Sequence, residues 1–327
     1  MLEHGGNLAV AANQYGIPIE NWLDLSTGIN PNNYPIADIP ASIWQKLPLD
    51  NDGLIEAACA YYGCQFILPS AGSQATLQVL PKLRKAAKIA MPQFMYQEHA
   101  IAWLRYGHEV IKFDAYPDEN IIKNADVVLL CNPNNPTATQ FLPSELLDWH
   151  GQLAKRGGWL IVDEAFIDVT PEYSIAQHAH LEGLFVLRSL GKFFGLAGAR
   201  VGFLLGAEQA LINAQEEIGP WSITGPSRLI AKQALIDKVW QEKMRLLLPD
   251  SSQRLAKLLS QYGLVPTAGT ALFQFTPTSQ AIAWQQHFAR QGIWVRLFSE
   301  VSALRFGLPP DDGWGRLKVA LHNFSCI

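Results

Sequence analysis

A single lysine, Lys192, stands in a segment crowded with glycine and aromatic residues, and Arg200 follows it eight residues later. The run from 184 to 187 that leads into this segment is apolar. A lysine among apolar side chains is poorly solvated, which lowers the pKa of its amine and makes the amine available as a nucleophile for Schiff-base chemistry. The segment therefore indicates an enzyme with an aldehyde cofactor, and an exposed loop lysine is the plainer alternative.

The segment does not match a phosphate-binding loop. That motif requires a glycine where Val186 stands and a serine or threonine where Phe193 stands. Of the two chemical interpretations, the aldehyde cofactor is therefore the one that fits the segment.

The composition is that of a soluble globular chain of 327 residues, with 49% hydrophobic and 17% charged residues. A net charge of −4 and the lack of a long basic run argue against nucleic acid as a partner and favour a small molecule. We expect a cytoplasmic protein without membrane attachment, because neither a signal peptide nor a membrane-length apolar run is present. The four cysteines match no zinc or redox spacing, His178 and His180 have no evident third ligand, and we predict no metal.

Short apolar runs that end in turn residues alternate with helical patterns through the first part of the chain. The runs span 88–91, 109–113, 126–131, 159–162 and 184–187. This alternation is typical of βαβ units and predicts an α/β fold with a mostly parallel sheet. In such sheets ligands bind beyond the carboxyl ends of the strands.

Polar and aromatic candidates follow these runs, or the earlier run 65–69, closely, which places them at one edge of the predicted sheet. They are Gly72, Ser73, Gln74, Phe94, Asn135, Asp163 and Lys192. The first three also open a helical pattern, where free backbone amides and the helix dipole favour a phosphate. Their convergence is the main sequence argument for a cofactor site.

Pyridoxal phosphate is an aldehyde cofactor that suits these residues. Lys192 supplies the amine for its aldehyde, and Asp163 can keep the ring nitrogen protonated by charge pairing. Phe94 can stack on the ring, with Tyr96 as the alternative, and the Asn135 amide can donate to the phenolate oxygen. A helix cap is the alternative role for Asp163.

The phosphate group of this cofactor needs amide donors and a cation. Gly72, Ser73 and Gln74 offer the amides, and Arg200 together with Ser189 completes the expected phosphate site. Together with Phe94, Asn135, Asp163 and Lys192, they form the predicted cofactor-binding set. Lys192 is also the predicted catalytic residue.

Composition and the pattern of predicted helices and strands divide the chain into three predicted parts. Residues 1–35, rich in glycine, asparagine and proline, form an N-terminal arm whose glycine amides could bind an anion, with a flexible leader as the alternative. Residues 36–222 form the large cofactor-binding domain, and residues 223–327 form a smaller α+β domain. In this last part a helical pattern runs from 227 to 248 and resumes at 250, so a helix break is expected at Pro249.

Two sets of motifs link the chain to a known family. The general set comprises Asn134-Asn135-Pro136-Thr137, Asp163-Glu164-Ala165 and the spacing from Lys192 to Arg200. The narrower set comprises His4-Gly5-Gly6-Asn7, Leu25-Ser26-Thr27-Gly28-Ile29-Asn30-Pro31, Phe166-Ile167-Asp168, Arg188-Ser189-Leu190 and Pro220-Trp221-Ser222. On these motifs the chain resembles fold-type I pyridoxal-phosphate enzymes of the histidinol-phosphate aminotransferase branch. Within that branch it is most similar to the threonine-phosphate decarboxylase family of cobalamin biosynthesis.

The resemblance implies decarboxylation of L-threonine O-3-phosphate to (R)-1-amino-2-propanol O-2-phosphate. It also implies that Arg305 binds the substrate carboxylate and that a second group binds the substrate phosphate. That second group is Arg296, His4, Gly5, Gly6 and Asn30. Two planar guanidiniums are chemically suited to a substrate that carries two anionic groups.

The resemblance further implies a homodimer, and it allows contact with the corrinoid enzyme that attaches aminopropanol. Two rival functions stay open: transamination of histidinol phosphate or a similar amine, and a non-catalytic binding subunit of the attachment step. The motifs alone separate neither decarboxylation from transamination nor threonine phosphate from serine phosphate.

Four positions depart from the pattern of the relatives. Phe166 stands where aminotransferase relatives carry tyrosine, and Gly191 where they carry serine or threonine, so two expected hydrogen-bond donors are missing. Gly28 replaces an asparagine, and Ala138 replaces a glycine.

Overall fold

The computed structural model describes residues 5–324. The chain forms two compact units, each defined by the contacts among its own residues. The larger unit comprises residues 33–135 and 139–242, and the smaller unit comprises residues up to 32, 136–138 and those from 243 onward. The domain boundaries expected after residues 35 and 222 stay a prediction. The N-terminal segment groups with C-terminal residues, since strand β1 (Leu23–Asp24) pairs in parallel with β11 (Ile293–Trp294).

Within the described residues, seven strands form the sheet of the larger unit in the order β2, β8, β7, β6, β5, β3, β4. Neighbouring strands are parallel except where β8 pairs with β2 and β7. The sheet is therefore mostly parallel, as the sequence predicts. The carboxyl ends of β2, β3, β5, β6 and β7 share one edge, and β8 begins at that edge because it runs the other way.

The strands of the larger unit are β2 (Ile67–Ser70), β3 (Lys88–Pro92), β4 (Glu109–Phe113), β5 (Val127–Cys131), β6 (Trp159–Asp163), β7 (Leu184–Ser189) and β8 (Gly202–Leu205). Its helices are α2 (Ala41–Trp44), α3 (Leu54–Tyr62), α4 (Ser73–Val79), α5 (Glu98–Arg105), α6 (Glu119–Asn124), α7 (Pro143–Ala154), α8 (Glu208–Ile218) and α9 (Gly225–Ile236).

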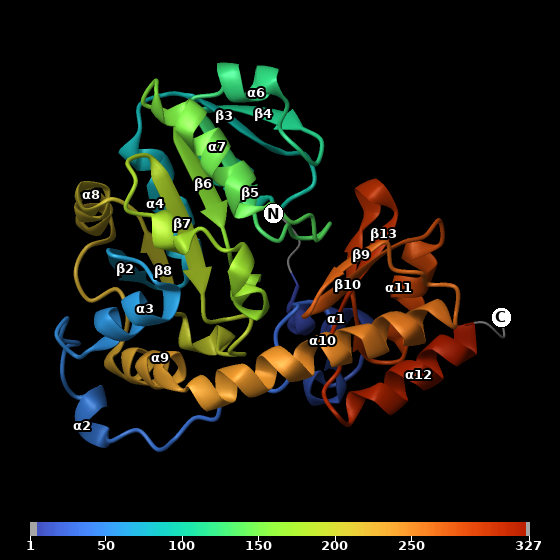
Figure 1. The fold of residues 1–327 in the computed structure, drawn as a ribbon. Helices are drawn as coiled ribbons and strands as arrows, with labels where there is room; N and C mark the ends of the chain where they lie inside the picture. The colour runs from blue at the N-terminus through green and yellow to red at the C-terminus, as the bar shows by residue number, and fades with distance from the viewer. Residues whose placement is uncertain (1–4, 325–327) are drawn as a thin grey trace. The chain divides into compact units, whose positions relative to one another are not determined.

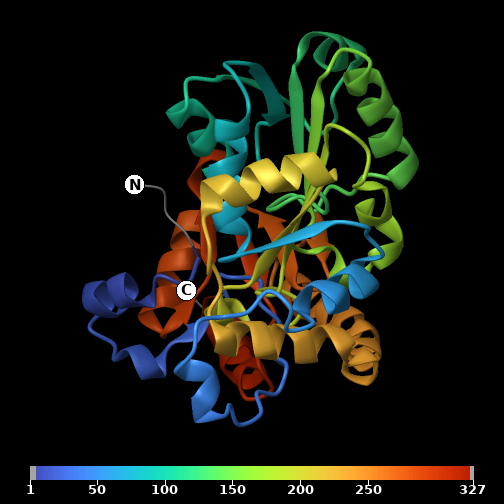
Figure 2. The same ribbon diagram turned by 90° about the vertical axis from the view of Figure 1, so that its left-hand side faces the viewer.

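Alternate side chains of the central strands pack on opposite faces of this sheet. Ile89, Leu129 and Ile161 belong to an apolar cluster with Trp103 of α5 and residues of α4 and α8, and burying each such side chain contributes about 1.5–3 kcal/mol. Helix α7 lies along the other face (Figure 1), while Figure 2 looks onto α8, drawn in gold. Asp163 follows Ile161 by two residues, so its side chain points toward the face that α5 covers.

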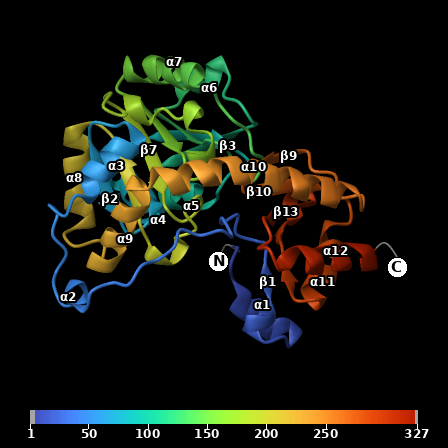
Figure 3. The same ribbon diagram turned by 60° about the horizontal axis from the view of Figure 1, so that its bottom comes forward.

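The smaller unit is built on a four-stranded antiparallel sheet in the order β12, β13, β10, β9. Its strands are β9 (Ala268–Thr270), β10 (Phe273–Pro277), β12 (Arg296–Phe298) and β13 (Ala303–Gly307), and its helices include α1 (Leu8–Tyr15), α11 (Ala281–Arg290) and α12 (Gly313–Phe324). Figure 3 shows α1 and β1, in blue, beside α11 in the red part of the chain. Helix α1 and strand β1 are thereby held against the last third of the chain.

Helix α10 (Lys238–Ser260) corrects the expected break at Pro249. The break instead falls at Asp237, whose carboxylate accepts a hydrogen bond of 3.0 Å from the Trp240 amide and so caps α10. Leu248 and Leu255 are fully buried, so an apolar stripe continues past the proline. Burial of that stripe outweighs the one backbone hydrogen bond that Pro249 removes.

No helix among the described residues has both the length and the apolar composition needed to cross a membrane. The expected cytoplasmic location stays a prediction.

Candidate active site

Asp163 ends strand β6 with its side chain nearly buried. Its Oδ2 accepts a hydrogen bond of 2.9 Å from Nε2 of His99, a buried residue of α5, and its Oδ1 accepts one of 3.0 Å from the Ala165 amide. An ionised carboxylate can only accept hydrogen bonds, so Nε2 of His99 carries the proton. The sheet edge thus holds one carboxylate in a fixed orientation.

Cys131 lies beside this pair and completes a group of donor atoms that a metal ion would recognise. The ligand atoms of His99, Cys131 and Asp163 lie within 4.8 Å of one another. Burial, helped by the charge of Asp163, raises the pKa of the Cys131 thiol well above its usual value. His99 and Cys131 thus both lie against the Asp163 carboxylate, and the His99 hydrogen bond orients it.

Lys192 lies in the turn after β7, half-buried, with its Nζ 5.1 Å from the centre of the Phe166 ring. The next two residues, Phe193 and Phe194, are fully buried. The Trp240 ring stacks on Phe194 at 5.5 Å and meets Phe193 edge-on at 5.4 Å. Aromatic packing therefore fixes the backbone that carries the amine.

Arg188, on β7, is a buried cation between two buried carboxylates. Its Nη1 donates to Glu164 over 2.7 Å and its Nη2 donates to Asp168 over 2.5 Å, while the Tyr62 ring lies 4.4 Å from the guanidinium. Burial alone would lower the pKa of Arg188, but the charges of Asp168 and Glu164 raise it overall. The cluster ties the chain just after β6 to β7 itself.

The turn between β2 and α4 approaches the start of β8 very closely. A Cβ at Gly202 would lie 2.3 Å from the Ser73 amide nitrogen, and one at Gly72 would lie 2.7 Å from Nη2 of Arg200. Gly72 has φ +78°, which favours glycine, and Ser189 pairs with Gly202 across β7 and β8. Backbone amides and a guanidinium are thus brought together, a combination that suits a phosphate.

The side chain of Gln74 is engaged within the protein. Its Nε2 donates to Glu98 over 3.0 Å, and its Oε1 accepts a hydrogen bond of 3.1 Å from the Tyr96 hydroxyl. Burial, together with the charges of Glu98 and Asp163, raises the pKa of Tyr96 to about 12, so this hydroxyl stays protonated. Gln74 therefore offers its backbone amide to a ligand.

Phe94 and Asn135 follow β3 and β5 at the same edge. Phe94 is 39% exposed, and its carbonyl oxygen accepts a hydrogen bond of 2.7 Å from Nδ2 of Asn134. Asn135 is half-buried. The nine predicted cofactor-binding residues therefore all lie in the larger unit, around one sheet edge.

Arg296 and Arg305 face each other across the antiparallel pair β12 and β13 in the smaller unit. Arg305 is buried and donates from Nη2 to the Ser26 carbonyl oxygen. Burial, together with the charge of Arg296, lowers the pKa of Arg305 to about 10, which leaves it charged at neutral pH. Like charges placed opposite each other in a sheet repel, and a bound anion would relieve that repulsion.

The predicted substrate residues of the N-terminal arm reach the same Ser26 turn. The Gly6 amide donates to Ser26 Oγ over 2.8 Å, and a Cβ at Gly5 would lie 2.5 Å from the Ser26 carbonyl oxygen. Asn30 is buried, and its Oδ1 accepts a hydrogen bond of 2.8 Å from the amide two residues on. His4, also predicted to contact substrate, lies outside the described residues.

The model of the aminotransferase class I and II family matches residues 45–325 of this chain. The chain belongs to this family. A threonine-phosphate decarboxylase from Pseudomonas aeruginosa is 48% identical to it over 99% of this chain and 98% of the relative. Another threonine-phosphate decarboxylase, from Sinorhizobium, is 37% identical over 97% of each chain. The family predicted from the motifs is confirmed.

A solved histidinol-phosphate aminotransferase from Sinorhizobium meliloti, in complex with pyridoxal 5′-phosphate, superposes with a TM-score of 0.83 at 20% identity. The match covers 99% of this chain and 95% of that one. It confirms the predicted fold-type I architecture, an α/β fold with a mostly parallel sheet. Family membership confirms pyridoxal 5′-phosphate as the cofactor.

The residues of the larger unit fit this cofactor. One amine, one buried carboxylate and an amide-lined cradle beside a guanidinium lie around a single sheet edge. The cradle is one that a Cβ at Gly202 or Gly72 would fill, which explains why both positions are glycine.

Sequence reasoning missed three contributors to this arrangement: His99, Trp240 and the ion pairs of Arg188. His99 is one histidine within an amphipathic helix, and Trp240 lies in a long helical pattern, so neither carries a local signal. The Arg188 ion pairs could have been predicted from the sequence. Glu164 and Asp168 are acidic residues that follow the strand run 159–162, and Arg188 directly follows the next strand run, 184–187.

We predict that Gly202→Ala weakens pyridoxal-phosphate binding about tenfold, because overpacking costs about 1–3 kcal/mol and here it displaces the Ser73 amide. The matched control is Gly198→Ala, whose added Cβ meets no atom within 4 Å. Fluorescence titration of the cofactor into each cofactor-free variant measures the dissociation constant. Equal losses of cofactor affinity in both variants would contradict a phosphate site at the Ser73 amide.

Proposed function

We propose that this protein decarboxylates L-threonine O-3-phosphate to (R)-1-amino-2-propanol O-2-phosphate with pyridoxal phosphate as cofactor. The observation that carries the proposal is the near full-length similarity to two threonine-phosphate decarboxylases. The facing arginines of the smaller unit support it, because the substrate carries both a carboxylate and a phosphate.

Bound pyridoxal phosphate supplies an electron-accepting ring that stabilises the negative charge left on the substrate when carbon dioxide departs. Lys192 would hold the cofactor through its aldehyde and would supply the proton that the α-carbon receives. Asp163, oriented by His99, keeps the proton on the ring nitrogen. Phe94 stacks on the ring, and Asn135 donates to its phenolate oxygen.

The cofactor phosphate is held at the turn before α4. The backbone amides of Ser73 and Gln74 would donate to it, and Arg200 with Ser189 would complete the site. The Gly72 amide, also predicted as a donor, instead donates to the Ser70 carbonyl oxygen over 2.7 Å. Phe166 contributes no phenol, so the phenolate oxygen depends on Asn135 alone among the predicted donors.

The choice of reaction depends on how the substrate is oriented. Arg305 would bind the substrate carboxylate, and this contact would help to select which bond of the α-carbon is broken. The remaining predicted residues anchor the substrate phosphate and thereby set the orientation. They are Arg296, His4, Gly5, Gly6 and Asn30.

The expected setting of this reaction is the cytoplasm. The product is an aminopropanol phosphate, and contact with the corrinoid enzyme that attaches it belongs to the same proposal.

We predict that the protein releases carbon dioxide and forms aminopropanol phosphate from threonine phosphate, as measured by mass spectrometry of the product. Lys192→Ala should slow turnover by at least about 10²–10⁴-fold, since it removes the proton-transfer group. Glutamate formation from histidinol phosphate and 2-oxoglutarate, without carbon dioxide release, would instead establish the aminotransferase alternative. If borohydride reduction did not attach the cofactor covalently to Lys192, the alternative of a non-catalytic binding subunit would be established.

We predict different binding losses for the two arginine variants. Arg305→Gln should weaken threonine phosphate about tenfold or more, because hydrogen bonds to charged groups contribute about 1.5–3 kcal/mol, and it should leave aminopropanol phosphate nearly unaffected. Arg296→Gln should weaken both ligands alike, because both carry the phosphate. Calorimetric titration of the two ligands measures these changes. Equal weakening of both ligands by Arg305→Gln contradicts its assignment to the carboxylate.

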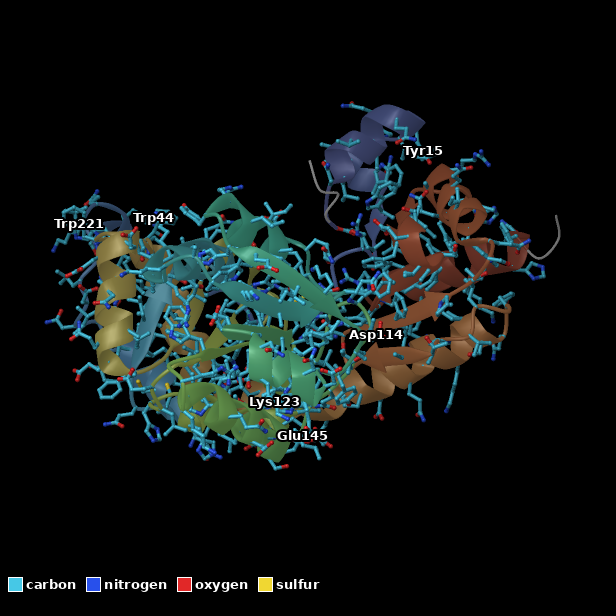
Figure 4. All side chains as sticks on the ribbon, turned by 90° about the horizontal axis from the view of Figure 1, so that it is seen from above. Tyr15, Trp44, Asp114, Lys123, Glu145 and Trp221 are labelled. Carbon is cyan, nitrogen blue, oxygen red and sulfur yellow. The ribbon has the colours of Figure 1, made fainter. Side chains whose placement is uncertain are left out.

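We also propose that the protein is a homodimer. The larger unit exposes a set of apolar side chains, each more than half exposed, and such patches mark interaction surfaces. They are Ile36, Trp44, Leu47, Leu49 and Trp221. Figure 4 labels both tryptophans at one end of this unit.

Sedimentation velocity should therefore show a dimer that the double change Trp44→Glu and Trp221→Glu dissociates. The control is Leu246→Glu, which places the same charge at an exposed apolar position of α10. A monomeric wild-type protein, or dissociation by the control alone, contradicts this interface.

A further inference from the structure

Helix α3 ends in a turn that brings two cysteines together. Gly63, with φ +68°, ends the helix in the left-handed conformation, and the amide of Cys64 then turns back to donate to the carbonyl of Cys59 over 3.2 Å. This backbone bond brings the two residues next to each other across the turn, as a disulfide between them requires. Both cysteines are free thiols in the structure.

The two thiols differ in accessibility. Cys59 is half-buried, and its Sγ lies 3.9 Å from the carbonyl oxygen of Gln65, whereas Cys64 is only 9% exposed. A reagent in solution can therefore reach Cys59 first. The Cys64 thiol is close enough to the buried Arg188 to feel its charge, and the Arg188 guanidinium lies over the Tyr62 ring.

The interaction between the two thiols gives them different acidities. The hydrogen bond from Cys64 lowers the pKa of Cys59, and the same bond, together with burial, raises the pKa of Cys64. Thiolate character and exposure together mark the cysteine that attacks in thiol–disulfide exchange. Cys131, by contrast, is buried, and burial raises the pKa of its thiol.

We propose that Cys59 and Cys64 form a thiol–disulfide exchange site for small-molecule disulfides such as oxidised glutathione. The Cys59 thiolate attacks one sulfur of the external disulfide, whose S–S bond breaks and releases one thiolate. Cys64 then gives its proton to water and attacks Cys59 Sγ, which releases the second thiol and closes the protein disulfide. The protein loses two electrons and two protons, and the external disulfide becomes two thiols.

Reaction at Cys59 prepares Cys64 for its step. Once Cys59 is part of a mixed disulfide, it no longer accepts a hydrogen bond as a thiolate from Cys64, so the influence of Cys59 that raises the pKa of Cys64 is removed and burial remains.

The turn that carries this pair also touches the active-site framework. The Tyr61 hydroxyl donates to Asp168 over 3.0 Å, and its ring lies 5.7 Å from that of Phe194, in the turn of Lys192. The Tyr62 ring lies over Arg188. The exchange site is therefore adjacent to the groups that position Lys192, although it includes none of them.

The test uses the full chain with Cys326→Ser, which leaves only the three described cysteines. The protein is incubated with oxidised glutathione, remaining thiols are alkylated, and peptides are analysed by mass spectrometry. The peptide with both cysteines should be about 2 Da lighter, without glutathione and without alkylation, and dithiothreitol should reverse the change. In Cys64→Ser, or in Cys64→Ala if serine unfolds the buried position, one glutathione should accumulate on Cys59.

The matched variant Cys59→Ser should take up no glutathione at Cys64, because the remaining thiol is buried. The same reaction in urea gives the unselective pattern, in which every cysteine reacts. The proposal is overturned if the folded Cys59→Ser protein is modified at Cys64, if Cys59 stays reduced in both Cys64 variants, or if Cys131 reacts as fast as Cys59 in the wild-type fold.

Discussion

The larger unit depends on one buried cation. Arg188 lies between Glu164 and Asp168 with almost no solvent contact, and a buried charge of this kind is tolerable only while its partners are present. Loss of one member of such a cluster typically costs about 3–5 kcal/mol, because the others are left uncompensated. Asp163 precedes this cluster by one residue and Lys192 follows it by four, so the spacing between acid and amine rests on it.

How far the site could be predicted follows from where each residue lies. Asp163 and Lys192 follow apolar runs, and parallel strands bring the ends of such runs to one edge, so these two could be placed from pattern alone. His99 could not, because its partner Asp163 is 64 residues away and lies on another element. Pro249 misled the helix prediction, since its local cost is smaller than the burial gained by continuing α10.

The smaller unit shows a different limit. The two arginines were suggested by family resemblance, but their facing positions depend on the register of β12 and β13, which no periodicity reveals. Their surroundings depend on pairing between the two ends of the chain, through β1 and β11. Ser26 is where these ends meet, since its carbonyl accepts from Arg305 and its hydroxyl accepts from Gly6.

The facing arginines also bear on how this protein should be handled. Two like charges held opposite each other repel, even with the Asp24 carboxylate acting on Arg305, and a small polyvalent anion bound to both would stabilise the unit. Sulfate or phosphate in a purification buffer would therefore act as a ligand and not as an inert salt. Melting temperatures and inhibition constants measured in such buffers would be those of the anion-bound protein. A chloride buffer therefore gives the cleaner reference state.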